Sequence, residues 1–312
     1  MDKYRYDSED HLRVAIITGA GGGLGRAHAL LLAQLGCAVV VNDLGVTTSG
    51  EGKSEKAADK VVNEIQLSGG RAVANYDSVV DGDKIVQCAI DHFGRVDIVV
   101  NNAGILRDTS FQRMGEKQWD IIFDVHVKGA FSVTKAAWRY MKEQGFGRVV
   151  MTSSSSGLYG NYGQANYGAA KMALLGFANS LAIEGQRANI LVNTIAPIAL
   201  SRMTKGLIPE DFEEVLKPEF VSPLVAYLCH PSCEENGSLF EVGGGWIAKV
   251  RLQRSLGGIA IDEEGKVSVA SVADNFEKMC DFDDAETPST NQEAFVHIME
   301  AGEIYQKRKA RM

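Results

Sequence analysis

Tyr167 and Lys171 are the two residues whose types and spacing best suit acid–base chemistry. They are four apart in a segment with helical spacing of apolar residues, so a helix would place both side chains on one face. An ammonium about 5 Å from a phenol would lower the pKa of that phenol by about two units from its usual ~10, at an effective dielectric of about 20. The pair is therefore predicted to exchange a proton with a substrate near neutral pH.

Ser154 is the third candidate of this group. It lies where the apolar run Val149–Thr152 ends and a loop rich in serine, glycine and tyrosine begins, thirteen residues before Tyr167. Its hydroxyl could return across that loop and donate a hydrogen bond to a substrate oxygen. Because Tyr-x-x-x-Lys also occurs by chance on amphipathic helices, the prediction depends on the elements that position these side chains.

A glycine-rich turn near the N-terminus is typical of a dinucleotide site. The apolar strand Arg13–Thr18 ends in the spacing Gly-x-x-x-Gly-x-Gly, and a segment with helical periodicity follows. A helix N-terminus offers unpaired N–H groups and the positive end of its dipole to a pyrophosphate, and glycines let the phosphate approach. The residues predicted to bind it are Gly19, Gly23, Leu24 and Gly25.

Asp43 ends the next apolar run and is predicted to select the cofactor. An acid at this place can accept hydrogen bonds from both ribose hydroxyls and repels a 2′-phosphate, which favours NAD over NADP. The alternative is an ordinary loop aspartate. Asp77, just beyond a third strand, could meet the adenine amino group. The remaining cofactor contacts are expected at the ends of later strands: Asn102, Ala103, Gly104 and Pro197.

Seven apolar strands alternate with six helices, which predicts an α/β fold with a doubly wound, parallel seven-stranded sheet of Rossmann type. Ligands of such sheets bind outside the carboxyl ends of the strands, where the candidate residues are expected to meet. We assign residues 1–246 to this catalytic domain and 247–312 to a C-terminal extension. The pair Thr290 and Glu293 predicts a capping box that begins a last helix, whose apolar side should pack on the core or on a partner subunit.

Composition limits the function classes. The chain has 312 residues, of which 45% are hydrophobic and 23% charged, as in an ordinary soluble protein. A formal net charge of −8 argues against nucleic acid as the main partner, and no apolar run reaches the ~20 residues of a membrane span. Cys229 and Cys233 gather too few ligands for zinc, so no metal is predicted. A cytoplasmic location is expected, with a peroxisomal one as the alternative because Ala310-Arg311-Met312 resembles a peroxisomal address.

The motifs together resemble those of the short-chain dehydrogenase/reductase superfamily over roughly residues 12–246. The matching positions are Thr18-Gly-x-x-x-Gly-x-Gly, Asn101-Asn102-Ala103-Gly104, Ser154 and Tyr167-x-x-x-Lys171. The resemblance implies that the tyrosine is the general acid/base and that the serine holds the carbonyl oxygen. It also implies that the lysine binds the nicotinamide ribose and lowers the pKa of the tyrosine.

Longer segments, such as Val41–Gly45 and Gly157–Tyr167, look most like the (3R)-hydroxyacyl-CoA dehydrogenase unit of the peroxisomal multifunctional enzymes of type 2 and its stand-alone bacterial relatives. This resemblance implies NAD-dependent oxidation of a (3R)-hydroxyacyl-CoA in fatty-acid β-oxidation, by a homodimer or homotetramer. It suggests a separate enoyl-CoA hydratase as a partner, although these residues show none. The cations that could meet the coenzyme A phosphates are Arg107, Arg202 and Lys205.

Other functions stay open at this point. A hydroxysteroid dehydrogenase is one alternative, because a steroid and an acyl chain both need an apolar cleft. A 3-oxoacyl reductase is disfavoured by Asp43, because such reductases generally use NADPH. A nucleotide-sensing or scaffold protein on the same fold would not need Ser154, Tyr167 and Lys171 together.

The chain departs from the superfamily pattern at two places. His126 stands where many members have an asparagine that helps to hold a proton-relay water, and we hypothesise that its imidazole takes over this duty. The alternative is that the backbone carbonyl of His126 holds the water. Pro197-Ile198 replaces the usual Pro-Gly, which leaves the geometry of the following substrate segment open.

Overall fold

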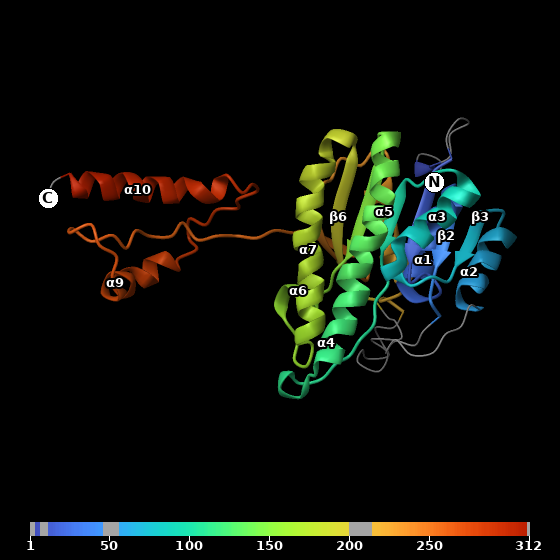
Figure 1. Cartoon of the computed structure of the whole chain (residues 1–312), viewed down its shortest axis with the longest axis horizontal. Coiled ribbons are helices and arrows are strands. Elements are labelled where there is room, and N and C mark those ends of the chain that lie inside the picture. Colours follow the sequence, from blue (N-terminus) through green and yellow to red (C-terminus); the bar gives the residue numbers. More distant parts are fainter. Residues whose placement is uncertain (1–3, 7–11, 46–55, 200–213, 311–312) are drawn as a thin grey trace. The chain divides into compact units, whose positions relative to one another are not determined.

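The computed structural model describes residues 4–6, 12–45, 56–199 and 214–310 (Figure 1). The chain divides into two compact units, Met1–Lys249 and Val250–Met312. Among the described residues, no helix combines the length and the apolar character needed to cross a bilayer.

The first unit is built on an eight-stranded sheet with the strand order β3-β2-β1-β4-β5-β6-β7-β8. Every neighbouring pair from β3 to β7 is parallel. Most of the central strands are buried along their whole length, as expected for a sheet covered on both faces. The strands are β1 (Val14–Thr18), β2 (Ala38–Asn42), β3 (Arg71–Asn75), β4 (Ile98–Asn101), β5 (Gly147–Thr152), β6 (Ile190–Pro197), β7 (Leu239–Gly243) and β8 (Trp246–Val250).

The predicted doubly wound α/β fold is confirmed, but the sheet has one strand more than the seven predicted. The added strand, β8, follows β7 after only Gly244 and Gly245, whose φ angles are 59° and 81°. Positive φ at both central residues is what a two-residue hairpin turn of type I′ requires. The prediction missed β8 because it treated this run of glycines as the end of the sheet.

Helices cover both faces of the sheet (Figure 1). Helices α1, α2 and α8 share one apolar core with Ala15 and Ile17 of β1, whereas α3, α5 and α7 share the other with Val14 and Ile16. Alternate side chains of a strand point to opposite faces, so β1 contributes to both cores. The helices of this unit are α1 (Gly23–Gln34), α2 (Lys56–Leu67), α3 (Gly82–Phe93), α4 (Glu116–Phe123), α5 (Gly129–Gln144), α6 (Ser155–Tyr159), α7 (Ala165–Gly185) and α8 (Ser222–Cys229), with short 3₁₀ turns at Val79–Asp81, Phe111–Arg113, Gln186–Ala188 and Pro218–Phe220.

Apolar residues follow helical spacing from Glu116 to Lys142, but this segment is not one continuous α-helix. A π-helical turn, Asp124–Lys128, separates α4 from α5. Apolar spacing does not distinguish one widened turn from continuous α-helix, so this turn could not be predicted from the sequence. Such turns occur frequently at functional sites, and this one carries His126.

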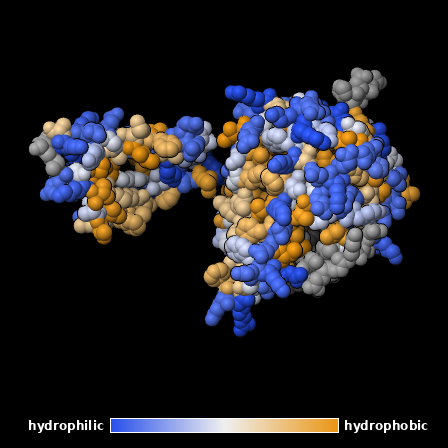
Figure 2. All heavy atoms as spheres, in the orientation of Figure 1, coloured by the Kyte–Doolittle hydropathy of each residue, from blue (hydrophilic) through white to orange (hydrophobic). Residues whose placement is uncertain are grey.

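The second unit contains α9 (Val269–Met279) and α10 (Val296–Lys309), with a 3₁₀ turn at Glu293–Phe295. Thr290 and Glu293 are bonded locally, because the Glu293 N–H donates to the Thr290 hydroxyl at 3.3 Å, and the Glu293 carboxylate accepts from the Ser289 N–H at 2.7 Å. These bonds precede the 3₁₀ turn, and α10 itself begins only at Val296 without a side-chain cap, so the predicted capping box does not begin the last helix. None of the described residues from 251 to 310 is buried, and many apolar side chains lie at the surface (Figure 2). This unit therefore has no enclosed core of its own.

Candidate active site

The structure brings Ser154, Tyr167 and Lys171 together at the carboxyl end of β5. Ser154 caps the short helix α6, where its hydroxyl oxygen accepts from the Ser156 N–H at 3.2 Å, and its side chain is hydrogen-bonded to the Tyr167 hydroxyl. Lys171 lies one turn further along α7 and donates from Nζ to the Thr152 carbonyl at 2.6 Å. A phenol, a hydroxyl and an amine thus lie close together at this strand end.

The pKa values of this group differ from the prediction. Burial raises the pKa of Tyr167 to about 12, although its hydrogen bond with Ser154 acts in the opposite direction, and burial lowers the pKa of Lys171 to about 7. The sequence predicted that Lys171 would lower the pKa of Tyr167. In the structure Lys171 Nζ is engaged by Thr152 and lies 5.4 Å from the centre of the Tyr167 ring. Desolvation is therefore the largest cause of both pKa shifts.

His126 packs against Tyr167 inside the site. The two rings meet edge to face with centroids 5.3 Å apart, and His126 Nε2 lies 3.1 Å from the Ile105 nitrogen and 2.9 Å from its carbonyl oxygen. Its Nδ1 is buried without a partner among the described residues. Burial, followed by the charge of Lys171, holds the pKa of His126 well below its usual value, so the ring is neutral. A Cβ atom on Gly104 would lie 2.5 Å from His126 Cε1, and glycine at that position is what lets the ring fit.

The glycine turn between β1 and α1 has the shape expected of a pyrophosphate site. Gly23 and Leu24 begin α1, whose first turn carries no acidic residue, and the space beside Gly23 is open. A Cβ atom on Gly19 would lie 2.8 Å from Ala103 Cα, and one on Gly25 would lie 2.3 Å from the Gly19 oxygen. The turn therefore requires glycine for close packing, and the first N–H groups of α1 have no side-chain cap at Gly22.

Asn102 links the floor of this site to β1. Its Nδ2 donates to the carbonyl oxygens of Thr18 and Gly19 at 2.9 and 3.2 Å. The Thr18 hydroxyl in turn accepts from the N–H groups of Asn102 and Ala103. These bonds hold together the carboxyl ends of β1 and β4, between which the strand order changes direction. That position in a doubly wound sheet is where dinucleotides bind.

Asp43 and Asp77 lie at the ends of β2 and β3. The Asp43 carboxylate accepts from the Gly21 and Gly45 N–H groups, both at 2.7 Å, which ties it to the glycine turn. A carboxylate has about four lone-pair sites, so it retains capacity for ribose hydroxyls. Asp77 accepts from Asn75 Nδ2 at 2.9 Å and thereby joins a network of side chains at the same edge of the sheet.

Other predicted residues are placed as follows. Pro197 ends β6, and the next residue, Ile198, donates its N–H to the Val242 carbonyl at 2.8 Å. Arg107 lies in the loop after β4, and its carbonyl accepts from the side chain of Asn166. Arg202 and Lys205 lie outside the described residues.

Sequence reasoning missed Asn166, which is fully buried beside Tyr167 and bonds to two other segments. Its position directly before the tyrosine was the available signal. The same reasoning assigned no role to Asp108, whose carboxylate accepts from Gln164 Nε2 at 2.7 Å.

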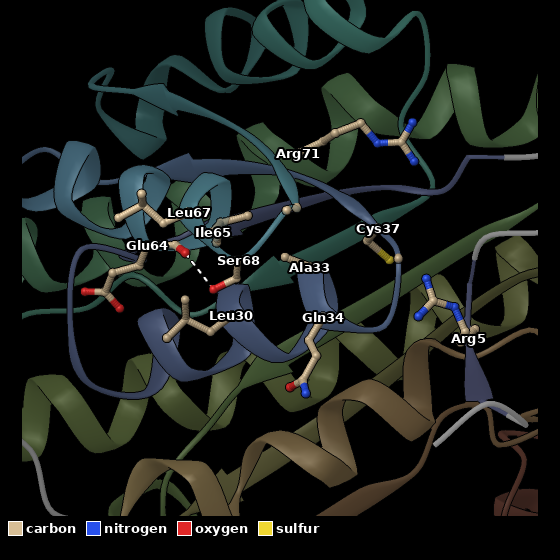
Figure 3. Close-up of a pocket in the computed structure, with 13 residues that line it drawn as sticks. Arg5, Leu30, Ala33, Gln34, Cys37, Glu64, Ile65, Leu67, Ser68 and Arg71 are labelled. Carbon is tan, nitrogen blue, oxygen red and sulfur yellow. Dashed lines mark hydrogen bonds between the residues drawn. The ribbon is translucent and has the colours of Figure 1, made fainter.

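A cavity of about 800 Å³ is lined by a different set of residues, among them Leu30, Glu64 and Arg71 (Figure 3). Its lining includes Gly36 and Cys37, which precede β2, and Gly70, which precedes β3, so it opens at the amino ends of the strands. Among the predicted site residues that the structure describes, none lines it. Parallel sheets of this kind bind their ligands at the opposite end, and size alone does not make this cavity the active site.

The comparisons with known proteins agree with this geometry. Residues 13–210 match the short chain dehydrogenase family. The peroxisomal multifunctional enzyme type 2 of Mus musculus is 59% identical over 288 residues, which are 92% of this chain and 39% of that protein. The structure of full-length peroxisomal multifunctional enzyme type 2 from Drosophila melanogaster has a TM-score of 0.81 and 43% identity, and the match covers 97% of this chain and 50% of that one. The chain therefore spans half or less of the length of these relatives.

A third similar protein is 7α-hydroxysteroid dehydrogenase, whose structure is complexed with NADH and 7-oxo glycochenodeoxycholic acid. It has a TM-score of 0.69 and 28% identity, and the match covers 78% of this chain and 96% of that one. The family match covers more than half of the chain and includes the glycine turn, Ser154, Tyr167 and Lys171. The chain thus belongs to the short-chain dehydrogenases, a family of oxidoreductases that act on hydroxyl groups and generally use NAD or NADP.

Proposed function

We propose that the chain oxidises a (3R)-hydroxyacyl-CoA to the 3-oxoacyl-CoA with NAD, as a step of fatty-acid β-oxidation. The observation that carries this proposal is the extent of the similarity. The match to the Drosophila multifunctional enzyme takes in 97% of the chain, so it includes most of residues 250–312, whereas the match to the steroid dehydrogenase takes in 78%. The residues expected to perform the reaction are already close together in the site.

Tyr167 is the proposed general base and takes the proton of the substrate hydroxyl. Ser154 donates a hydrogen bond to the same oxygen as it gains carbonyl character, and the Ser156 N–H on its Oγ orients this hydroxyl. A bound oxidised nicotinamide would supply the hydride acceptor for C3 and a positive charge that would favour the phenolate. That charge would act against the burial that raises the pKa of Tyr167.

His126 is proposed to pass the proton on toward Lys171. Its unpartnered Nδ1 has the capacity to bind a water, and its pKa keeps the ring neutral, so it can accept on one nitrogen while donating on the other. The electrostatic effect of Lys171 on the His126 pKa supports the proximity of the two groups.

Asp43 supports NAD as the cofactor rather than NADP. Its carboxylate is held beside Gly21 at the entrance of the glycine turn, where a 2′-phosphate would meet a negative charge. Asp77 and Pro197 complete the proposed cofactor contacts. Arg107, Arg202 and Lys205 remain the proposed contacts of the coenzyme A phosphates.

We also propose a homodimer or homotetramer in which residues 247–312 pack on the core or on a partner subunit. The absence of buried residues among 251–310 supports this, because exposed apolar side chains such as Phe276 and Ile298 would otherwise remain in water. A second apolar surface is a groove of about 360 Å³ lined by Phe123, Val127, Phe131 and Phe177. Removal of residues 257–312 should impair association or raise KM for the acyl-CoA.

The names of the multifunctional relatives support a peroxisomal location over the predicted cytoplasmic one. Those relatives include a hydratase-dehydrogenase-epimerase, which supports a hydratase as the functional partner.

The second candidate function is oxidation of a steroid alcohol, favoured by the similarity to 7α-hydroxysteroid dehydrogenase.

NADH formation separates these functions. The chain would be assayed with (3R)- and (3S)-hydroxyacyl-CoA of several lengths, with a 7α-hydroxysteroid, and with NADP in place of NAD. We expect turnover of the (3R) thioesters with NAD. Turnover of the steroid alone, or of the (3S) thioesters at the same rate, would reject the proposal.

A further inference from the structure

Asn166, the residue directly before Tyr167, connects the catalytic helix to two other segments. Its Nδ2 donates to the carbonyl oxygens of Arg107, at 3.3 Å, and of Gln118 in α4, at 3.0 Å. Its Oδ1 accepts from the Tyr167 N–H at 2.8 Å. Both amide hydrogens and the amide oxygen are thus used, and the side chain has no exposed surface.

The bond to the Tyr167 N–H replaces a missing cap. The first N–H groups of a helix have no intrahelical acceptor, and Gln164, at the N-cap of α7, makes no capping bond with its side chain. Gln164 instead donates to Asp108 at 2.7 Å, and the Thr109 N–H donates to the Gly163 carbonyl at 2.9 Å. The start of α7 is therefore bonded to three consecutive residues of the loop after β4.

The same loop is held from its other end by His126, which bonds to Ile105. His126 also packs edge to face on Tyr167. The contacts form a closed circuit that runs from Asn166 through Arg107 and Ile105 to His126 and back to Tyr167. A change at Asn166 would thus displace Tyr167 in two ways: directly, through the Tyr167 backbone, and indirectly, through the loop after β4 and His126.

We propose that Asn166 is a positioning residue, whose amide fixes the first turn of α7 to the loop after β4 and to α4 and so sets where the Tyr167 hydroxyl lies relative to Ser154 and His126. The proposal rests on the proposed role of Tyr167 as proton acceptor and does not depend on which alcohol is the substrate. Displacement of a reacting group by about 1 Å can cost about 100-fold in rate, so hydrogen bonds at this position are expected to matter for kcat.

Asn166→Ala removes all three bonds, and Asn193→Ala is its matched control. Asn193 is also buried, donates to the Glu235 carbonyl at 2.6 Å and accepts from the Ser238 N–H at 3.1 Å, but it lies in β6. We expect both variants to lose stability in urea. Only Asn166→Ala should lower kcat, by about 10- to 100-fold with KM within about threefold of the parent value.

The primary deuterium isotope effect on kcat provides the second readout, with an alcohol deuterated at the reacting carbon. Misplacement of the proton acceptor slows the chemical step, so the isotope effect should rise in Asn166→Ala and stay at the parent value in Asn193→Ala. Asn166→Asp retains an acceptor for the Tyr167 N–H but loses both amide donors, and we expect it to lose kcat as well. It also replaces the alanine variant if that chain does not fold.

Parent-like kcat and isotope effect in Asn166→Asp would overturn the inference, because the helix cap alone would then suffice. Equal losses of kcat per folded molecule in Asn166→Ala and Asn193→Ala would also overturn it. These assays use whichever alcohol the parent oxidises. Failure of the parent with (3R)-hydroxyacyl-CoA therefore counts against the proposed substrate and not against Asn166.

Discussion

Replacement of Lys171 by methionine should change how the stability of the protein depends on pH. Lys171 is 3% exposed, and burial lowers its pKa from 10.5 to about 7. Between these two values the unfolded chain holds a proton on this amine that the folded chain has lost. Unfolding therefore becomes less favourable as the pH rises through this window. The cost of burying the ammonium is complete below pH 7 and disappears towards pH 10.5.

The size of the effect follows from the shift. A shift of about 3.5 units corresponds to a ceiling of about 5 kcal/mol, of which about 3 kcal/mol is removed between pH 7 and pH 9.5. Methionine has no charge to bury, so the free energy of unfolding of Lys171→Met should lack this part of the increase with pH. The variant also loses the hydrogen bond from Nζ to the Thr152 carbonyl, which lowers its free energy of unfolding by about 1 kcal/mol at every pH. We therefore expect the variant to be more stable than the parent at pH 7 and to lose that advantage by pH 9.5.

Urea unfolding of the parent and the variant at several pH values, in buffer without nucleotide, measures this difference. His126 stays neutral throughout the range, because its pKa lies well below 6.5. Other titrating groups, such as Cys229, whose pKa burial raises to about 12, affect both proteins alike and cancel in the difference. Lys142→Met, at an exposed position of α5, is the control and should leave the slope unchanged. Parallel stability curves for the parent and Lys171→Met would refute the reasoning.

Three further predictions concern single residues of the site. Tyr167→Phe should lower kcat by about 10²- to 10⁴-fold while NADH binding, followed by fluorescence, is retained; turnover at the parent rate would reject the general base. Gly104→Ala should lower the free energy of unfolding in urea by about 1–3 kcal/mol, because its Cβ would lie 2.5 Å from His126 Cε1. Adding His126→Ala should recover part of that loss, and additive losses in the double variant would contradict the clash. Asp43→Asn should shift the ratio of kcat/KM for NAD over NADP by about tenfold towards NADP, since it removes the charge that opposes a 2′-phosphate, and an unchanged ratio would remove Asp43 from cofactor selection.

Much of the fold was available from the sequence because its signals are local. Strands buried on both faces need continuous apolar runs such as Val14–Thr18, and a close approach of backbones needs glycine at Gly19 and Gly25. The alternation of strands and helices then places the carboxyl ends of the parallel strands, β1 to β7, at one edge of the sheet. For this reason the positions of Asn102, Ser154 and Tyr167 at that edge could be predicted without knowledge of any contact.

Properties that depend on burial, or on contacts between residues distant in the chain, could be known only from the tertiary structure. The pKa of Tyr167 rises instead of falling because desolvation depends on everything packed around the ring, which the spacing to Lys171 does not contain. The π-helical turn that carries His126 leaves the apolar pattern of its helix nearly unchanged. Asn166 appears in the sequence as one more polar residue, and only the folded chain brings Arg107 and Gln118 to its amide. Hydrogen bonds between segments are set by distance in space, and the sequence records distance only along the chain.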